Sequence, residues 1–337
     1  MASLIDIPEL PLKSILEKLG YVEIQCLRKT CHSLRHFIDT TQPEQSIDAL
    51  KISGSPGKIS LLIYGNDNIN GNDGPQLYPD GQKIHVVYQA LKGENAEITW
   101  FRKDKERQKA ILNENFSELL SRDFGLILDC KLPILRTFSM DFKNTCKRLL
   151  EKQLSNKNPI KTNTLIMDNA HQDEILSFLS YICADTLEKL LIQLADWIGP
   201  IDISKIVELE HWKKTREMHI AGVSVMAGIQ NFEHFTSLIV RFDVLYLEDV
   251  LFLKELFLHT SSTFKQYRIS FGKLSDRNAF IQEFGLPLTE QRETLTFERP
   301  DDKEHVVKVE FSHIFDRVLE FKIIKKCDVP NEVEVVN

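Results

Sequence analysis

The N-terminal stretch PELPLKSILEKLGYVEIQCLRKTCHSLRHFIDT, residues 8–40, decides how the rest of the chain is organised. Its first apolar residues recur at spacings of three and four, which places them on one face of a helix. These residues are Leu12, Ile15, Leu16 and Leu19. Pro11 fits the first turn of that helix, where its missing N–H leaves no hydrogen bond unmade, and Gly20 ends the helix at Leu19.

Two further helices are predicted in this stretch, over Val22 to Lys29 and over Cys31 to Thr40. The last of them carries four apolar side chains on one face: Cys31, Leu34, Phe37 and Ile38. Three helices in about 33 residues cannot bury a self-sufficient core. We therefore expect the block to expose an apolar patch and to need a partner, because such patches mark interfaces.

Beyond the helical block the apolar pattern becomes that of short strands. Runs rich in Ile, Val, Tyr and Trp occur at Lys58 to Tyr64, Lys83 to Gln89 and Glu97 to Arg102. The segment from Gly65 to Gly81 is polar and rich in glycine, which predicts a long exposed connection. A helix is expected near Lys105 to Leu120.

From about residue 124 an apolar-x-x-apolar-x-apolar signature repeats. Its copies are Leu135-Phe138-Met140, Leu187-Leu190-Ile192, Phe235-Leu238-Val240 and Phe264-Tyr267-Ile269, with weaker copies at Thr162-Leu165-Met167 and Thr215-Met218-Ile220. Their central positions are about 20 to 29 residues apart, which is the range of leucine-rich repeats. Helix-like segments lie between the copies: Asn144 to Leu154, His171 to Ile182, Ile203 to Glu208 and Leu247 to His259.

The repeat departs from the usual pattern where each turn follows its strand. The usual repeat has Asn or Cys three positions after the last apolar residue, whereas this chain has Lys143, Ala170, Ala195, Val223, Asp243 and Gly272. The sequence therefore predicts a mixed α+β or α/β chain in which a helical module precedes a short β region and an irregular, leucine-rich-repeat-like strand–helix solenoid. The expected divisions are 1–45, 46–123, 124–326 and a tail at 327–337.

Composition excludes several classes of function. A net charge of −7, a pI near 5.9 and the absence of a long Lys/Arg run argue against a nucleic-acid partner. No apolar stretch approaches the roughly 20 residues of a membrane span, and Asp6 and Glu9 stand where a signal peptide has basic residues. An intracellular location, in the cytoplasm and/or the nucleus, is expected. The widely spaced cysteines indicate reduced core thiols: Cys26, Cys31, Cys130, Cys146, Cys183 and Cys327.

Candidate metal sites have simpler explanations. His32 and His36 have a metal-compatible spacing, but no third ligand pattern accompanies them, so a solvated helix face is favoured. The run DNINGNDG, Asp67 to Gly74, has the composition of a calcium loop, yet Ile69 occupies a ligand position and no Glu closes the loop. A polar connection is the better interpretation there. We expect neither a metal nor a cofactor.

Catalytic candidates are equally weak, since no nucleotide-binding, nucleophile-elbow or zinc-protease motif occurs. His171 with Asp173 and Glu174 opens a predicted helix, where the acidic residues favour capping over catalysis. For Trp100, Trp197 and Trp212 core packing is the commoner role, and Trp197 is the best candidate for an exposed anchor. An enzyme is therefore the least favoured class.

The helical block resembles the F-box. The resemblance rests on Pro8, the Ile15-Leu16-x-x-Leu19 face, the turn Leu27-Arg28-Lys29 and the ending Leu34-Arg35-x-x-Ile38-Asp39 in this order. The stretch is similar to the nematode F-box A family, in which the F-box precedes an FTH domain, and the later strand–helix pattern also looks like that family.

The resemblance implies a fold and a partner. F-box modules bind a Skp-type adaptor, and through it a cullin and a RING subunit, while the C-terminal domain holds a target protein. The positions that correspond to the apolar F-box positions are Pro8, Ile15, Leu16, Leu19, Leu27 and Leu34. Pro11 replaces an apolar residue common in the family, which implies a shorter first helix and a weaker outer contact with the adaptor.

The expected function is that of a non-catalytic substrate-recognition subunit of an SCF-type ubiquitin ligase. An adaptor-binding scaffold for protein–protein interactions without a ligase role is the alternative. If the repeats form an arc, a substrate is expected on the strand-lined face, because repeat arrays bind along such surfaces. The outward strand positions are then Ser139, Ile166, Leu191, His219, Ile239 and Arg268.

Overall fold

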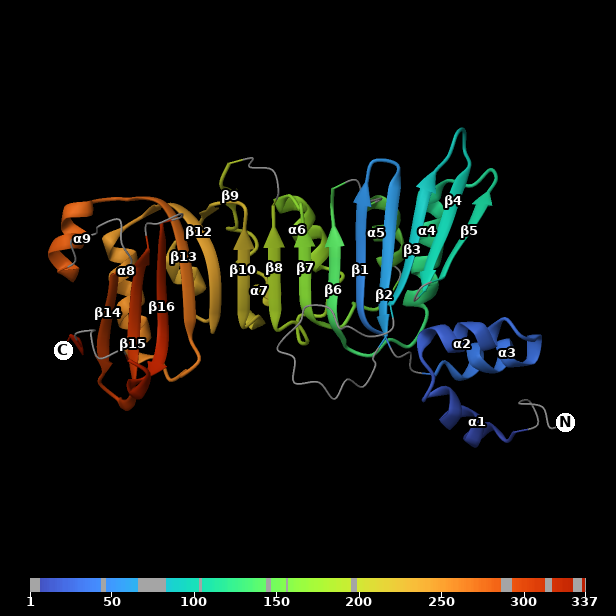
Figure 1. Ribbon diagram of the computed structural model, residues 1–337, viewed down its shortest axis with the longest axis horizontal. Helices are drawn as coiled ribbons and strands as arrows, with labels where there is room; N and C mark the ends of the chain where they lie inside the picture. Colours follow the sequence, from blue (N-terminus) through green and yellow to red (C-terminus); the bar gives the residue numbers. More distant parts are fainter. Residues whose placement is uncertain are drawn as a thin grey trace. The chain divides into compact units, whose positions relative to one another are not determined.

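A computed structural model gives the fold of the chain (Figure 1). It describes residues 7–43, 47–65, 83–102, 105–143, 147–155, 157–194, 199–285, 293–312, 317–329 and 335–336. The chain forms two compact units. Unit 1 comprises Met1–Ala170 with Ser177–Leu187, and unit 2 comprises His171–Leu176 with Glu188–Asn337.

Unit 1 begins with the predicted helical block. Its helices are α1 (Glu9–Leu16), α2 (Tyr21–Arg28) and α3 (His32–Thr41). Leu16, Ile24 and Ile38, one from each helix, form a small buried cluster. Helix α1 ends three residues before the predicted Leu19, because the N–H groups of residues 18 and 19 bond to carbonyls only three residues back and form a tight turn. Gly20 is the extended N-cap residue of α2.

The sheet of unit 1 has the order β5-β4-β3-β2-β1-β6-β7. The strands from β5 to β1 pair antiparallel, whereas β1, β6 and β7 are parallel. Their bounds are β1 (Ile47–Ser55), β2 (Lys58–Gly65), β3 (Lys83–Ala90), β4 (Ala96–Arg102), β5 (Lys105–Ile111), β6 (Leu135–Asp141) and β7 (Thr162–Asp168). The strands predicted at β2, β3 and β4 are confirmed, and β1 is an additional strand.

The predicted helix near Lys105 to Leu120 is wrong. Its first part is the edge strand β5, which pairs with β4 from Lys105 to Ile111. The run KERQKAI has no apolar helical face, and all but its last residue are exposed, so the backbone pairing of a hairpin decides its conformation. The helix α4 (Phe116–Leu128) follows, and the Asn115 side chain caps it by accepting a hydrogen bond from the Ser117 N–H at 2.9 Å.

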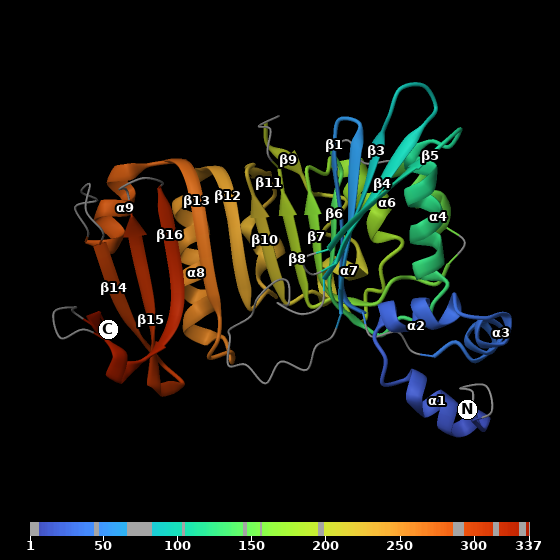
Figure 2. The same ribbon diagram turned by 45° about the vertical axis from the view of Figure 1, so that its right-hand side comes forward.

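Helices cover one side of this sheet. Helix α4 packs against β2, β3 and β4 and against α5 (Lys147–Leu154), which Figure 2 shows from the side. Phe124 of α4 stacks on Phe138 of β6, which in turn stacks on Phe178 of α6 (Gln172–Leu179) with ring centroids 5.9 Å apart. The central signature residue Phe138 is therefore a core residue, as its pattern predicted.

The sheet of unit 2 has the order β8-β10-β12-β13-β16-β15-β14-β17. The first four strands are parallel: β8 (Lys189–Gln193), β10 (Glu217–Ala221), β12 (Ser237–Leu245) and β13 (Gln266–Leu274). The strands β16 (Val318–Lys325), β15 (Asp302–Ser312) and β14 (Glu293–Arg299) continue antiparallel, and β17 (Val335–Val336) pairs with β14. A separate pair joins β9 (Ile201–Asp202) to β11 (Val225–Met226).

Short helices accompany these strands in unit 2. They are α7 (Glu210–Lys214), η2 (Ile229–Phe232), α8 (Leu247–His259), α9 (Arg277–Phe284) and η3 (Lys326–Asp328). Aromatic pairs fix two of them on the sheet: Phe257 of α8 packs against Tyr267 and Phe321, and Phe284 of α9 packs against Phe311. The predicted helix at Leu247 to His259 is confirmed.

The predicted strand–helix alternation holds only in part. The six signature copies are parallel strands, but Ile203 to Glu208 forms hydrogen-bonded turns that precede α7 in place of the predicted helix. Beyond α9 the chain forms antiparallel strands, where further repeats were expected. The described residues thus form a helical module and large mixed sheets, and the fold does not confirm a leucine-rich-repeat-like solenoid.

At the end of β10 and near the end of β13, close backbone approach is found where the usual repeat has Asn or Cys. Gly222 has φ 82°, and a Cβ atom there would lie 1.8 Å from the carbonyl oxygen of Leu194. A Cβ atom on Gly272 would lie 2.7 Å from the carbonyl oxygen of Asp243. In unit 1 the Asn169 side-chain amide donates to Asp141 at 2.8 Å. The turns after the strands are therefore irregular, as the sequence predicted, because different contacts are found at different strands.

We expect Gly222→Ala to lower the free energy of unfolding by roughly 2 kcal/mol or more, because both the left-handed backbone and the Leu194 carbonyl oppose a Cβ atom. Gly285→Ala is the matched control, since Gly285 has φ 65° but no atom within 4 Å of the place that a Cβ atom would occupy. That variant should cost about 1 kcal/mol. Urea unfolding of both variants checks this. Equal losses would show that the contact with Leu194 is unimportant.

Candidate protein-binding surfaces

Some apolar residues of the helical block are buried in its core, and others are exposed on its surface. Leu16 is fully buried and Leu34 is buried, while Leu19 and Leu27 pack against the cluster of Leu16 from its rim. Pro8 is exposed and Ile15 is 37% exposed. The predicted adaptor-binding set therefore contains both residues that hold the module together and residues that are available to a partner.

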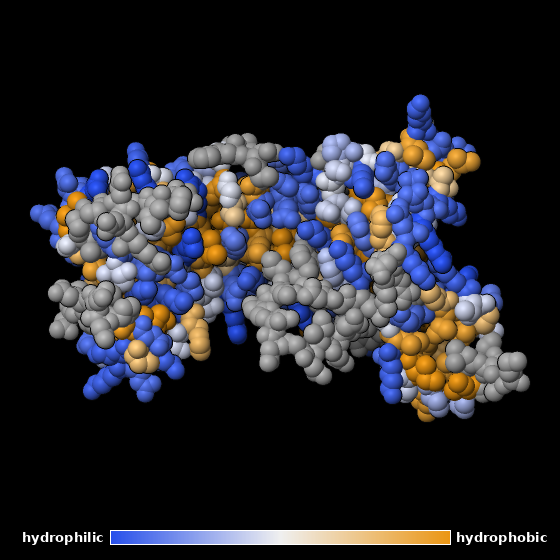
Figure 3. All heavy atoms as spheres, viewed as in Figure 1, coloured by the Kyte–Doolittle hydropathy of each residue, from blue (hydrophilic) through white to orange (hydrophobic). Residues whose placement is uncertain are grey.

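One exposed apolar residue of α1 was not predicted. Leu10 is 81% exposed, although it lies in the first turn beside the exposed Pro11. Leu12 and Leu16, spaced i and i+4, are buried and occupy the side of α1 that faces the module. In the space-filling view a hydrophobic patch lies over α1–α3 (Figure 3). The spacing of Leu10 from Leu12, which places it outside the apolar stripe, was the signal that the sequence offered.

Polar contacts fix the helices that carry this surface. The Arg28 guanidinium donates to both carboxylate oxygens of Asp39, at 2.6 and 3.3 Å, and thereby ties α2 to α3. Arg35 of α3 donates to the carbonyl oxygen of Arg28 at 3.2 Å. These are the arginines and the aspartate of the ordered sequence match, so the motif supplies a bidentate clamp in addition to apolar packing.

Buried ionisable groups lie where helix α4 packs on the sheet of unit 1. The Tyr88 hydroxyl of β3 donates to Asp123 of α4 at 2.7 Å. Burial raises the pKa of Asp123, and burial raises the pKa of Tyr21 at the start of α2, where Cys130 and Asp123 add to the effect.

The predicted outward strand positions fall into two aligned rows. In unit 1, Ser139 pairs with Ile166. Both are buried, contrary to the outward position expected of them, because β6 and β7 bury side chains on both faces as central parallel strands do. The Ser139 hydroxyl is buried without a hydrogen-bond partner among the described residues. These two residues offer no surface to a substrate.

The row in unit 2 is accessible. Leu191 pairs with His219, His219 with Ile239, and Ile239 with Arg268. The first three side chains are half-buried and Arg268 is exposed. Their neighbours along each strand, such as Leu190 and Met218, are buried in the core, so the period-2 alternation was predicted in the correct register. We name Leu191, His219, Ile239 and Arg268 the strand-face row.

Comparison with known proteins bears on both surfaces. The F-box domain family matches residues 4–44, and the FTH domain family matches residues 144–286. The chain therefore contains an F-box domain and an FTH domain. It is 23% identical over 283 residues to F-box A protein 224 of Caenorhabditis elegans, which covers 80% of this chain and 67% of that relative. No solved structure matches the chain. The predicted resemblance to the F-box A family is confirmed.

Helices α1, α2 and α3 are thus the F-box, and the FTH domain contains β7, the strand-face row and the helices between them. An F-box implies a protein–protein interaction adaptor, and the matched families include no enzymatic domain. Within the described part of the chain no helix is long and apolar enough to span a membrane. The same residues contain no cluster of three or more His, Cys, Asp or Glu side chains that could hold a metal ion.

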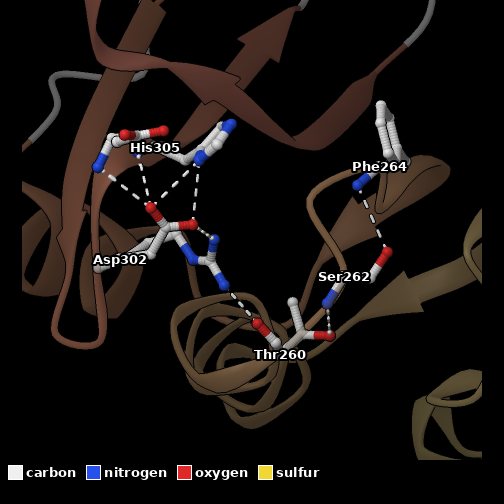
Figure 4. A network of polar contacts seen from close by, with 7 residues as sticks. Thr260, Ser262, Phe264, Asp302 and His305 are labelled. Carbon is white, nitrogen blue, oxygen red and sulfur yellow. Dashed lines mark hydrogen bonds and ion pairs between the residues drawn. The ribbon is translucent and has the colours of Figure 1, made fainter.

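A polar network in unit 2 joins residues 260–264 of the FTH domain to residues 299–305 beyond it, and it has the residue types of a catalytic site (Figure 4). Asp302 accepts one hydrogen bond from Arg299 at 2.6 Å and contacts the Nδ1 atom of His305 at 3.0 Å. Arg299, whose side chain is almost fully buried, also donates to the carbonyl oxygen of Thr260. The Ser262 hydroxyl accepts from the Phe264 N–H and is directed away from His305. The network joins the β14–β15 turn to the end of α8, so its role is structural.

Other predicted candidates have structural roles. Trp212 is buried and donates to the carbonyl oxygen of Asn231 at 3.0 Å, which makes it a core residue. Glu174 accepts from the His171 N–H at 2.9 Å, so capping is confirmed there. Trp197 and the Asp67 to Gly74 run lie outside the described residues. The described cysteines are unpaired, but Cys26 and Cys327 are exposed and are not core thiols.

We expect Asp302→Asn to lower the Tm at pH 7, because the amide carries no charge to pair with the buried Arg299. Hydrogen bonding to His305, with help from the Glu304 N–H, holds the pKa of Asp302 below its ordinary value of 3.8. The stabilisation by Asp302 is therefore present above that value and is lost as the pH falls through the folded-state pKa.

Thermal unfolding between pH 3 and pH 7 tests this expectation. The Tm difference between wild type and Asp302→Asn should shrink below about pH 4. The neighbouring exposed Asp301 provides the control, and Asp301→Asn should behave as wild type throughout. A Tm difference that persists undiminished at pH 3 would show that Asp302 acts through shape and not through its charge.

Proposed function

We propose that this F-box protein is the substrate-recognition subunit of an SCF-type cullin–RING ubiquitin ligase. The observation that carries the proposal is the division within α1: Leu12 and Leu16 hold the F-box together, whereas Leu10 and Ile15 remain exposed on its surface. A small module that leaves large apolar side chains in water gains stability when a partner covers them. The Skp-type adaptor is that partner, and it brings the cullin and the RING subunit.

In this role the protein supplies proximity and no chemistry. The F-box holds the adaptor, while the strand-lined face of the FTH domain, organised as an irregular solenoid-like array, holds the target protein. No cofactor or metal is required for such a function. The protein would act inside the cell, in the cytoplasm and/or the nucleus, where ubiquitin ligases of this class meet their substrates.

Substitutions in α1 separate binding from folding. We expect Ile15→Ala combined with Leu10→Ala to reduce affinity for the Skp-type adaptor by about thirty-fold, which corresponds to about 2 kcal/mol, while the Tm stays near that of wild type. Leu112→Ala is the matched control, because Leu112 is 71% exposed but lies outside the F-box. Titration of purified protein with the adaptor measures the change.

Leu16→Ala should behave differently from the exposed pair. Leu16 is fully buried, so its truncation is expected to destabilise the F-box by about 2–5 kcal/mol and to weaken adaptor binding through unfolding of the module. Loss of helical signal and loss of binding should therefore occur together. Unchanged adaptor binding in the Leu10/Ile15 variant would remove the adaptor assignment.

The ligase role has its own test. Proximity labelling with the intact protein, compared with a chain that lacks residues 1–45, should identify proteins that accumulate only when the F-box is missing. These proteins would be the substrates. Recruitment of the adaptor without the cullin would instead favour an interaction scaffold that has no ligase role.

A further inference from the structure

The strand-face row combines apolar side chains with a free cation. Adjacent strands lie about 4.8 Å apart, so the row from Leu191 to Arg268 spans about 14 Å across four parallel strands. In the space-filling view a hydrophobic band runs over β8, β10 and β12 on the side of the sheet that the helices leave open (Figure 3). Leu191 and Ile239 are the apolar members of the row, on either side of His219.

The carboxylates beside the row bond to residues other than Arg268. Lys189 forms an ion pair with Glu217 at 2.9 Å, one position along the face from Leu191 and His219. Gln266 donates to Glu320 at 2.8 Å, and Glu320 is the residue opposite Arg268 on β16. The printed contacts of both carboxylates are with residues other than Arg268, so the guanidinium keeps its donors available to a partner.

Arg268 itself is exposed and makes no hydrogen bond or ion pair with any residue that the structure describes. A guanidinium group offers five donors in a planar fork that matches a carboxylate. His219 also has no hydrogen-bond partner among the described residues, and burial, with Lys189 nearby, lowers the pKa of His219. The row therefore presents two apolar side chains, one neutral imidazole and one positive charge that has no partner in the described part of the chain.

We propose that the strand-face row binds an extended segment of a partner protein that carries apolar residues and one Asp or Glu. The carboxylate pairs with Arg268, and the apolar side chains cover Ile239, His219 and Leu191. This inference rests on the proposed function, in which the bound segment belongs to the substrate. The available cation next to an apolar band selects an acidic segment over a basic one through charge complementarity.

The geometry also sets the spacing within the segment. His219 and Arg268 are two strands apart, about 10 Å. An extended segment in the polyproline II conformation covers this distance in about three residues, and its residues i and i+3 face the same side. The acidic residue should therefore stand about three positions from the apolar residue that contacts His219 and Leu191. Intervening side chains face away from the sheet and contribute little to selection.

Synthetic peptides test the proposal on the full chain. The probes are fluorescein-labelled peptides with two Leu residues in a Gly/Ser background, with Asp, Asn or Lys placed one to five positions away. Fluorescence anisotropy should show that Asp at a distance of about three binds about tenfold tighter than Asn, and that Lys abolishes binding.

Variants connect the preference to the row. Arg268→Glu should reverse the preference from Asp to Lys peptides, and Ile239→Ser should weaken binding of all apolar peptides. Lys303→Glu changes an exposed charge at the start of β15 and should leave every affinity as in wild type. Circular dichroism verifies that each variant is folded.

Two results would overturn the inference: equal binding of Asp, Asn and Lys peptides, or the same loss in Arg268→Glu and Lys303→Glu. Self-association of the chain that Arg268→Glu abolishes would also overturn it, because the occupant would then be a second copy. Adaptor binding by Arg268→Glu is measured in parallel. Normal adaptor binding without peptide selectivity refutes this inference alone, whereas peptide selectivity without adaptor binding refutes the proposed function alone.

Discussion

In unit 2 the parallel strands β8, β10, β12 and β13 pair in register without a shift between residues, and the arrangement of the FTH domain depends on this constraint. Side chains alternate between the faces of a strand, so a slip of one residue would exchange the core for the surface. The central signature residues Leu190, Met218, Leu238 and Tyr267 are buried because the register aligns them. The same register aligns the strand-face row on the other side.

Close backbone contacts accompany that register at the end of β10 and within β13. Gly222 and Gly272 let the chain pass directly over the carbonyl oxygens of Leu194 and Asp243. A bulkier residue would push neighbouring turns apart and shift the strands that follow. Packing from the helix side adds to this effect, since Phe257 contacts both a parallel strand at Tyr267 and an antiparallel strand at Phe321.

The sequence predicted those features that local patterns determine. The central residues of the signature, from Phe138 to Tyr267, share one pattern of alternating apolar residues. Each of them lies in a strand and is buried, as that alternation predicts. Helix α8 was predicted at its observed bounds, because the segment Leu247 to His259 is rich in apolar residues and has acidic residues in its first turn. The F-box helices were predicted on the same grounds, apart from the end of α1.

Features that tertiary context determines were missed. The run Lys105 to Ile111 is polar and becomes a strand only because β4 offers it a hydrogen-bonding edge. The antiparallel strands β14, β15 and β16 follow a parallel array, and nothing in their local sequence marks the change of direction. Burial of Ser139 and Ile166 depends on both faces of unit 1 being covered, which spacing along one strand cannot reveal. The exposure of Leu10 likewise depends on how three helices divide a single small core.

Each member of the strand-face row comes from a different strand, and its backbone is fixed by the core side chains that flank it. A substitution in the row therefore alters the chemistry of the surface at one point and leaves the packing behind it intact. Related chains could acquire new binding preferences by single exchanges, one strand at a time, on an unchanged scaffold. Such a surface tolerates a change of chemistry at each strand, whereas Gly222 and Gly272 leave no room for a Cβ atom.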